Sequence, residues 1–291
     1  MKIIKSILEI QQITTKLHQS KKTIGFVPTM GYFHKGHLSL MKQAKHENEI
    51  SIVSIFVNPL QFGPNEDYDS YPRDEERDIN LAKQMGVDYL FMPTIEEMYP
   101  TEMVIKMAAT ERTNALCGRS RPGHFDGVIT VLTKLFHIVQ PNKIYFGLKD
   151  AQQVAVVDAL ITDLNFPIDL VGLSTVRDNS GLAMSSRNIN LTKEERDQAI
   201  WLYKSLKIGQ QLIVDGEENP VIIKKEIINT LKQHIDVGID YVEILEFPSL
   251  HTVSVIDKKQ IIIAVAIFFK YARLIDNLIL NMDGQVLKRL D

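Results

Sequence analysis

The chain reads Val27-Pro28-Thr29-Met30-Gly31-Tyr32-Phe33-His34-Lys35-Gly36-His37 where an apolar run gives way to a helical pattern. The residues just before, Thr23–Val27, are apolar, β-branched or aromatic and predict a buried strand. The residues just after, Leu38–Ala44, predict the start of a helix. A turn from strand to helix presents unpaired backbone N–H groups at the helix N-terminus, where phosphate binds readily.

Two histidines lie in this turn. His34 and His37 are three residues apart, a spacing that places both on one face of a helix. Gly31 and Gly36 let a bulky ligand approach the backbone. The pattern predicts a nucleotide triphosphate held by imidazoles, whereas the structural alternative is a pair of ordinary surface or core histidines.

Strands and helices are predicted to alternate through the first two thirds of the chain. Further strands are predicted at Ile50–Val57, Tyr89–Met92, Lys143–Phe146 and Ile168–Leu173. Helices are predicted at Leu38–His46, Arg73–Met85, Val128–Val139 and Ala151–Asp163. This alternation predicts an α/β fold with a Rossmann-like, doubly wound parallel sheet. Ligands in such sheets bind beyond the carboxyl ends of the strands.

A second, smaller α+β domain is predicted after the polar segment Ser174–Asn190. Thr192 and Glu195 have the spacing of a capping box, which predicts a helix that continues to about Val214. The remaining predicted elements are a helix at Pro220–His234 and strands at Tyr241–Glu246 and Gln260–Phe269. We therefore expect domains at 1–176 and 177–291, the second of which acts as a lid.

Composition limits the class of protein. The chain has 291 residues, 45% of them hydrophobic, and a net charge of -3, so it lacks the basic excess of a nucleic-acid-binding protein. Its single cysteine, Cys117, excludes an intrachain disulfide and suits a reducing compartment. Met1–Gln12 resembles an amphipathic helix rather than a signal peptide. The longest apolar run, Ile261–Phe269, is too short to span a bilayer. We expect a cytoplasmic protein with neither nucleic acid nor membrane as a partner.

Polar residues follow two other predicted strands. Asn58 and Gln61 carry amides that donate and accept, which suits a substrate with hydroxyl and carboxylate groups; the alternative is a simple Asn-Pro turn. Lys149 would neutralise triphosphate or transition-state charge. Asp150 would either line the cleft or cap the next helix, and Gln153 would face the same cleft.

Two polar clusters complete the candidate site. Met184-Ser185-Ser186-Arg187-Asn188 offers hydroxyls and a guanidinium for a phosphate clamp on a closing loop, with a solvated turn as the alternative. An acidic patch is expected to be mostly surface, with one or two members helping to hold magnesium, although no metal ligand is singled out. The patch comprises Asp67, Asp69, Asp74, Glu75, Glu76 and Asp78.

Together these motifs resemble the pantoate–β-alanine ligase family, among the nucleotidyltransferases with a His-x-x-His or His-x-Gly-His element. The matching segments, in chain order, are Pro28–His37, Phe56–Gly63, Tyr71–Arg73, Arg121–Phe125, Gly147–Gln153, Gly181–Asn188 and Arg273–Asn277. The family joins pantoate to β-alanine with ATP and Mg²⁺, and is usually a cytoplasmic homodimer.

The resemblance implies a role for each matching residue. His37, usually named as the proton donor, together with His34 and Lys149, would be catalytic. Gln61 and Gln153 would hold pantoate. The residues implied to contact ATP are Met30, Gly31, His34, His37, Gly147, Leu148, Lys149, Asp150, Val176, Met184, Ser185, Ser186 and Arg187.

The implied chemistry has two steps. Pantoate attacks the α-phosphorus of ATP, and the amine of β-alanine then attacks the acyl adenylate. Protonated histidines, Lys149, Arg187 and Mg²⁺ would stabilise the departing pyrophosphate. The family commonly has Gln or Glu at the position of Leu148, so a polar role for that side chain is in doubt here. Another nucleotidyltransferase, or a nucleotide-binding regulator without turnover, would also carry several of these motifs.

Overall fold

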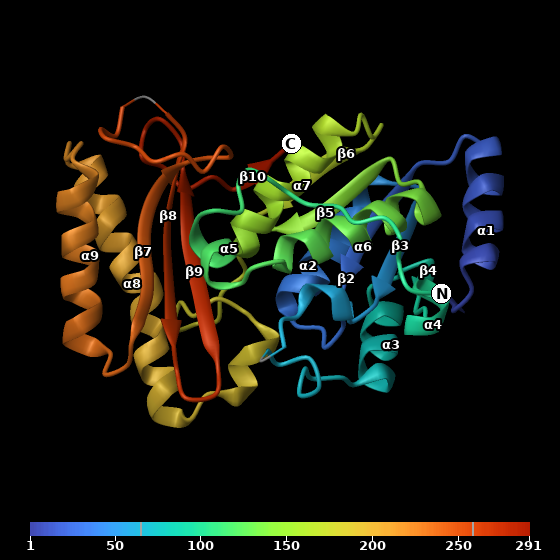
Figure 1. The fold of residues 1–291 in the computed structure, drawn as a ribbon, viewed down its shortest axis with the longest axis horizontal. Coiled ribbons are helices and arrows are strands. Elements are labelled where there is room, and N and C mark those ends of the chain that lie inside the picture. The colour runs from blue at the N-terminus through green and yellow to red at the C-terminus, as the bar shows by residue number, and fades with distance from the viewer. Residues whose placement is uncertain (65, 258) are drawn as a thin grey trace.

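A seven-stranded sheet forms the larger part of the molecule (Figure 1). The computed structural model describes residues 1–64, 66–257 and 259–291. In spatial order the strands are β1 (Lys2–Ile4), β4 (Tyr89–Phe91), β3 (Ile50–Ile55), β2 (Ile24–Thr29), β5 (Lys143–Gly147), β6 (Asp169–Leu173) and β10 (Arg289–Leu290). All neighbours are parallel except β10 and β6. The mostly parallel, doubly wound sheet is confirmed.

Helices connect the parallel strands of this sheet, so the loops that follow the strands lie at the same edge, at the carboxyl ends. The helices are α1 (Ile7–Gln19), α2 (Lys35–Glu47), α3 (Glu75–Gln84), α4 (Ile95–Met98), α5 (Leu116–Ser120), α6 (His124–Val139) and α7 (Ala151–Asp163). Short 3₁₀ turns follow the strands at η1 (Pro59–Gln61) and η2 (Leu148–Asp150). From β2 the chain goes outward through β3 and β4, and then returns to β5 on the other side of β2. The boundary between β2 and β5 is therefore the switch point, where a crevice is expected.

A three-stranded antiparallel sheet forms the second part, with the order β7 (Ile239–Glu246), β8 (Ile261–Phe268) and β9 (Arg273–Leu280). It follows η3 (Ser186–Asn190), α8 (Lys193–Val214) and α9 (Pro220–His234). Alternate residues of β8 point to opposite faces: Ile263 packs in a core with α8 and α9, whereas Ile262 packs in a core with α6 and α7. The small sheet is thus buried on both sides.

Several element predictions were wrong at their boundaries. The amphipathic helix expected over Met1–Gln12 is a strand followed by a helix, because Lys2–Ile4 pairs with β4 and Ser6 caps α1 by accepting from the Glu9 N–H. Helix α2 begins at Lys35 rather than Leu38, which places His37 in its first turn. Strands β9 and β10 were not predicted. Among the described residues, no helix is long and apolar enough to cross a membrane.

Candidate active site

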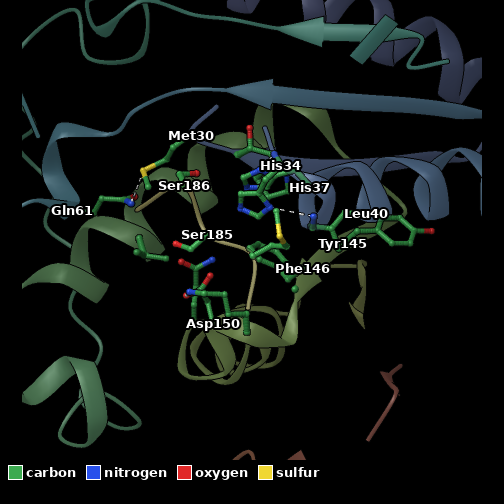
Figure 2. Close-up of a pocket in the computed structure, with 18 of the residues that line it drawn as sticks. Met30, His34, His37, Leu40, Gln61, Tyr145, Phe146, Asp150, Ser185 and Ser186 are labelled. Atoms are coloured by element: carbon green, nitrogen blue, oxygen red, sulfur yellow. Dashed lines mark hydrogen bonds and ion pairs between the residues drawn. The ribbon is translucent and has the colours of Figure 1, made fainter. Parts of the chain in front are cut away.

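A cavity of about 240 Å³ lies beyond the carboxyl ends of β2 and β5, at the switch point (Figure 2). His34 and His37 lie on one side of it, Asp150 and Ser185 lie across from them, and Gln61 lies at one end. The predicted site residues that line the cavity are Met30, His34, His37, Gln61, Gly147, Lys149, Asp150, Gln153, Val176, Met184, Ser185, Ser186 and Arg187. The lining does not include the predicted residues Gly31 and Leu148.

The two histidines are oriented by the start of α2. The Gly36 N–H donates to His34 Nδ1 at 3.1 Å, and the His34 N–H donates to His37 Nδ1 at 3.4 Å. The rings stack with centroids 4.0 Å apart. Because Nδ1 of each ring accepts from the backbone, the proton of the neutral imidazole lies on Nε2. Each ring therefore keeps its Nε2–H as a donor for a ligand in the cavity.

Both histidines are neutral at pH 7 in the free protein. Burial, reinforced by the Lys149 ammonium, lowers the pKa of His34 to about 4. Burial, with His34 and Lys149 nearby, lowers the pKa of His37 well below its ordinary value. Desolvation and the Lys149 ammonium disfavour the imidazolium in the free protein. The protonation of these histidines beside the departing pyrophosphate stays a prediction, because bound phosphates would favour the imidazolium.

The turn before α2 is held by an acidic residue from α3. Asp78 is only 1% exposed and accepts from the N–H groups of Tyr32 at 2.5 Å and Phe33 at 2.7 Å. The turn needs this support because Gly31 and Tyr32 both have positive φ, at 84° and 50°. Asp78 was expected in a mostly solvated patch. It is instead buried and bound to the backbone, which leaves it little capacity for a metal.

Gln61 is oriented by a chain of hydrogen bonds at η1. Asn58 Nδ2 donates to Gln61 Oε1 at 3.3 Å. Gln61 Nε2 in turn donates to Met30 Sδ at 3.0 Å (Figure 2). Asn58 is itself fixed, because its Oδ1 accepts from the Tyr99 hydroxyl at 2.9 Å and from the Leu60 N–H at 3.3 Å. Asn58 thus caps the turn and also fixes which end of the Gln61 amide is the donor.

The cationic side of the cavity combines η2 with the segment that begins η3. The Lys149 side chain is 18% exposed, and its Nζ lies 3.5 Å from Asp150 Oδ1. Asp150 makes no side-chain hydrogen bond to the start of α7, so the alternative role as a helix cap is not observed. Ser185 Oγ accepts from the Arg187 N–H at 3.3 Å, and Arg187 pairs with Asp67 at 2.8 and 3.0 Å.

The surroundings of Leu148 explain why a leucine is suitable at this position, where the family commonly has Gln or Glu. Its side chain is 3% exposed and belongs to the main core, and a Cβ on Gly172 of β6 would lie 2.7 Å from Leu148 Cδ2. A charged or amide side chain would be desolvated there without a partner. Leu148 thus anchors η2 to the large sheet, and only its backbone remains for a ligand.

Arg121 and His124 also line the cavity, although sequence reasoning gave them no role. Arg121 pairs with Glu66 at 2.5 and 2.6 Å. Its Nη1 lies 3.0 Å from His124 Nε2, and His124 Nδ1 lies 2.8 Å from the Gln61 carbonyl. Arginine only donates, so His124 is the neutral Nδ1–H tautomer. Burial and the guanidinium lower its pKa to about 4. The motif Arg121–Phe125 was the available signal.

The described residues contain no group of three or more His, Cys, Asp or Glu side chains placed to hold a metal ion. Magnesium does not require such a cage, because it commonly takes one or two carboxylates together with substrate phosphates and water. Asp150 fits this pattern, since it is an exposed carboxylate that lines the cavity.

Comparison with known proteins agrees with this geometry. The family model Pantoate-beta-alanine ligase matches residues 2–279. A pantothenate synthetase of Bacillus cereus (strain G9842) is 51% identical, covering 97% of this chain and all of the relative. One of Geobacillus sp. (strain WCH70) is 54% identical, covering 94% and 98% of the two chains.

Solved structures give the same result. A pantothenate synthetase from Thermus thermophilus superposes with a TM-score of 0.89 at 41% identity, covering 96% of this chain and 99% of that one. A pantoate-beta-alanine ligase from Francisella tularensis, complexed with beta-gamma ATP and beta-alanine, superposes with a TM-score of 0.78 at 35% identity, covering 96% and 97%.

Proposed function

Since this chain belongs to the pantoate–β-alanine ligase family and joins pantoate to β-alanine using ATP, we propose that the reaction passes through a pantoyl adenylate formed in the cavity between β2 and β5. The observation that carries this proposal is the convergence of imidazole, ammonium, hydroxyl and guanidinium groups on a cavity that also holds two glutamine side chains. The first set suits a triphosphate, and the glutamines suit a hydroxy acid.

The chemistry needs activation because a carboxylate is a poor electrophile. An oxygen of the pantoate carboxylate attacks the α-phosphorus, and the bond to pyrophosphate breaks. The neutral amine of β-alanine then attacks the acyl carbon, AMP leaves with the electron pair of the C–O bond, and the nitrogen loses one proton. Phosphoryl transfer asks the protein chiefly for positioning and for neutralisation of charge.

Each side chain has a distinct part in this scheme. His34 and His37 donate their Nε2–H groups to phosphate oxygens, while Lys149 and Arg187 supply positive charge toward the pyrophosphate. The negative charge of a bound triphosphate would raise the pKa of His37, and as an imidazolium this residue would be the proton donor. Ser185 and Ser186 donate hydroxyls to the same phosphates. The other ATP contacts would come from the lining residues Met30, Gly147, Asp150, Val176 and Met184. Gly31 and Leu148 lie outside the lining, so they would contribute backbone atoms only.

Pantoate is held by Gln61 and Gln153, both of which line the cavity. The bond from Asn58 turns the Nε2 donor of Gln61 away from the turn and toward Met30, where an acceptor on the substrate would replace the sulfur. A carboxylate or hydroxyl oxygen is a better acceptor than a thioether.

Magnesium would be held by the phosphates of ATP and by Asp150, and it would lower the charge on the leaving pyrophosphate. We further propose that the protein is a cytoplasmic homodimer in which the predicted domain 177–291, except for β10 in the large sheet, closes over the ATP site built on residues 1–176. The ion pair between Arg187 and Asp67 supports such closure, because it joins η3 to the loop that follows η1.

The test is to incubate the purified protein with ATP, Mg²⁺ and pantoate, with and without β-alanine, and to measure pyrophosphate and AMP. We expect pyrophosphate to require pantoate, and release of AMP to require β-alanine. ATP binding without pantoate-dependent pyrophosphate would contradict the adenylate mechanism and favour a nucleotide-binding regulator.

A further inference from the structure

One dipeptide of β9 contacts both segments that carry the cations of the cavity. We propose that Asp276 and Asn277 are positioning residues for adenylation, which hold Lys149 and the segment Ser185–Arg187 in a fixed relation to each other. This inference rests on the proposed role of Lys149 in that step. It assigns a function to the motif Arg273–Asn277, which has no part in the two-step scheme.

Asn277 holds the backbone of η2. Its Nδ2 donates to the carbonyl of Leu148 at 3.1 Å and to the carbonyl of Lys149 at 2.7 Å, and the residue is 6% exposed. Both amide protons are therefore used on two successive carbonyls. Because the Leu148 side chain is anchored in the main core and its carbonyl is held by Asn277, the stem of Lys149 has little freedom to shift.

Asp276 holds the segment that leads into Ser185. Its carboxylate accepts from both terminal nitrogens of Arg177, at 2.6 and 2.9 Å, and it is 2% exposed. Arg177 also donates to the Gly181 carbonyl at 3.1 Å, and Arg177 and Ala183 form an isolated antiparallel bridge. The Arg177–Asp276 pair thus closes a hairpin that ends directly before the residues of the phosphate clamp.

Through these contacts, β9 fixes the positions of both cationic segments, η2 with Lys149 and Ser185–Arg187. A buried bidentate pair and a doubly used amide hold their geometry, since displacement leaves buried polar groups unpaired. Misplacement of a reacting or stabilising group by about 1 Å costs on the order of 100-fold in rate. A dipeptide that is not part of the lining of the cavity can therefore govern adenylation through the atoms of Lys149.

The experiment is a double-mutant cycle with Asn277→Ala and Lys149→Ala, measured as single-turnover release of pyrophosphate from ATP and pantoate. We expect Asn277→Ala to slow adenylation by roughly 10- to 100-fold. We expect the double variant to be no slower than Lys149→Ala, because a positioning residue has nothing to position once the ammonium is gone. The attack of β-alanine on preformed pantoyl adenylate should change much less.

A matched control is Leu278→Val on the same strand, since Leu278 is buried but packs in the core with α8 and α9. It should lower the melting temperature without slowing adenylation selectively. If Asn277→Ala does not yield folded protein, Asn277→Ser takes its place in the cycle because it keeps one donor.

The inference would be overturned if the double variant were slowed by the product of the two single-variant rate losses. It would also be overturned if Asn277→Ala slowed both half-reactions equally. Normal adenylation by Asn277→Ala beside a slow Lys149→Ala would overturn this inference alone. Normal adenylation by Lys149→Ala would instead overturn the proposed role of Lys149, and this inference with it.

Discussion

At the residue scale, Lys149 is the side chain whose removal tests the adenylation step most directly. Lys149→Ala removes a charge from the pyrophosphate side of the cavity, and we expect the adenylation rate to fall by about 100-fold, or on the order of 3 kcal/mol. The measurement is pantoate-dependent pyrophosphate release. The same loss in a reaction started from pantoyl adenylate would contradict this role.

His124 gives a prediction about pH. Its pKa is about 4 in the folded protein, against an ordinary value of 6.5. Between pH 6.5 and about pH 4, the imidazole therefore binds a proton in the unfolded chain but not in the native state. The free energy of unfolding therefore falls as the pH drops from 7 toward 4. His124→Asn keeps a donor toward the Gln61 carbonyl but does not titrate. We expect its melting temperature to fall less between pH 7 and pH 5 than that of the wild type.

The control for His124 is His251→Asn, which changes an exposed histidine outside the cavity. Thermal melts of the three proteins across the same pH series make the comparison. An acid-side fall as steep in His124→Asn as in the wild type would show that this imidazole is not a source of the pH dependence.

The places of single residues in the cavity were predictable where a motif followed a strand, as at Lys149, His34 and His37. They were not predictable where a distant partner decides their state. Asp78 looks like surface charge in the sequence, and only the fold brings it to the N–H groups of Tyr32 and Phe33. The neutrality of His34 likewise depends on burial, which the spacing of the histidines does not encode.

At the element scale, the contact between α6 and η1 determines where Gln61 lies. Gly127 of α6 faces η1 so closely that a Cβ there would overlap the backbone of Leu60 and lie 2.6 Å from Gln61 Cα. We expect Gly127→Ala to push η1 outward, raising the Michaelis constant for pantoate by roughly 10-fold and costing about 1–3 kcal/mol of stability.

Steady-state kinetics with varied pantoate and varied ATP test this prediction. Gly238→Ala is the control, because a Cβ at Gly238 would meet no atom within 4 Å. A rise confined to the Michaelis constant for ATP would contradict the placement of pantoate beside Gln61.

Elements were predictable when their own residues determine them. The apolar, β-branched residues of β2 and β3 predict strands wherever they are placed. Strand β1 has only three residues and exists because β4 offers it an edge, which no local pattern reveals. Strand β9 was missed because Asp276 and Asn277 interrupt its apolar residues, and both are buried through contacts made far away in the chain.

At the scale of the whole molecule, the two parts share a core. Tyr241 and Ile262 of the small sheet belong to the same buried cluster as residues of α6 and α7. The sequence indicated a parallel α/β sheet and a smaller α+β part, and both are present. It could not indicate that they pack together, because the apolar residues on either side of β8 look alike in the sequence and differ only in which helices cover them.

The proposed homodimer is a property of the whole molecule and is tested by mass. Light scattering coupled to size-exclusion chromatography is expected to give twice the 33.2 kDa of the chain. We expect this mass to stay constant across a tenfold dilution. A monomeric mass at every concentration would contradict the proposal.

The pairing of β10 with β6 has a consequence for how the protein is made. On the ribosome, β6 emerges long before residues 289–290, so the growing chain carries an open sheet edge with unpaired N–H and C=O groups during that interval. Arg289 also pairs with Glu47, at the end of the helix that begins at the two histidines. A purification tag or a truncation near residue 290 would therefore act on the sheet that supports the cavity.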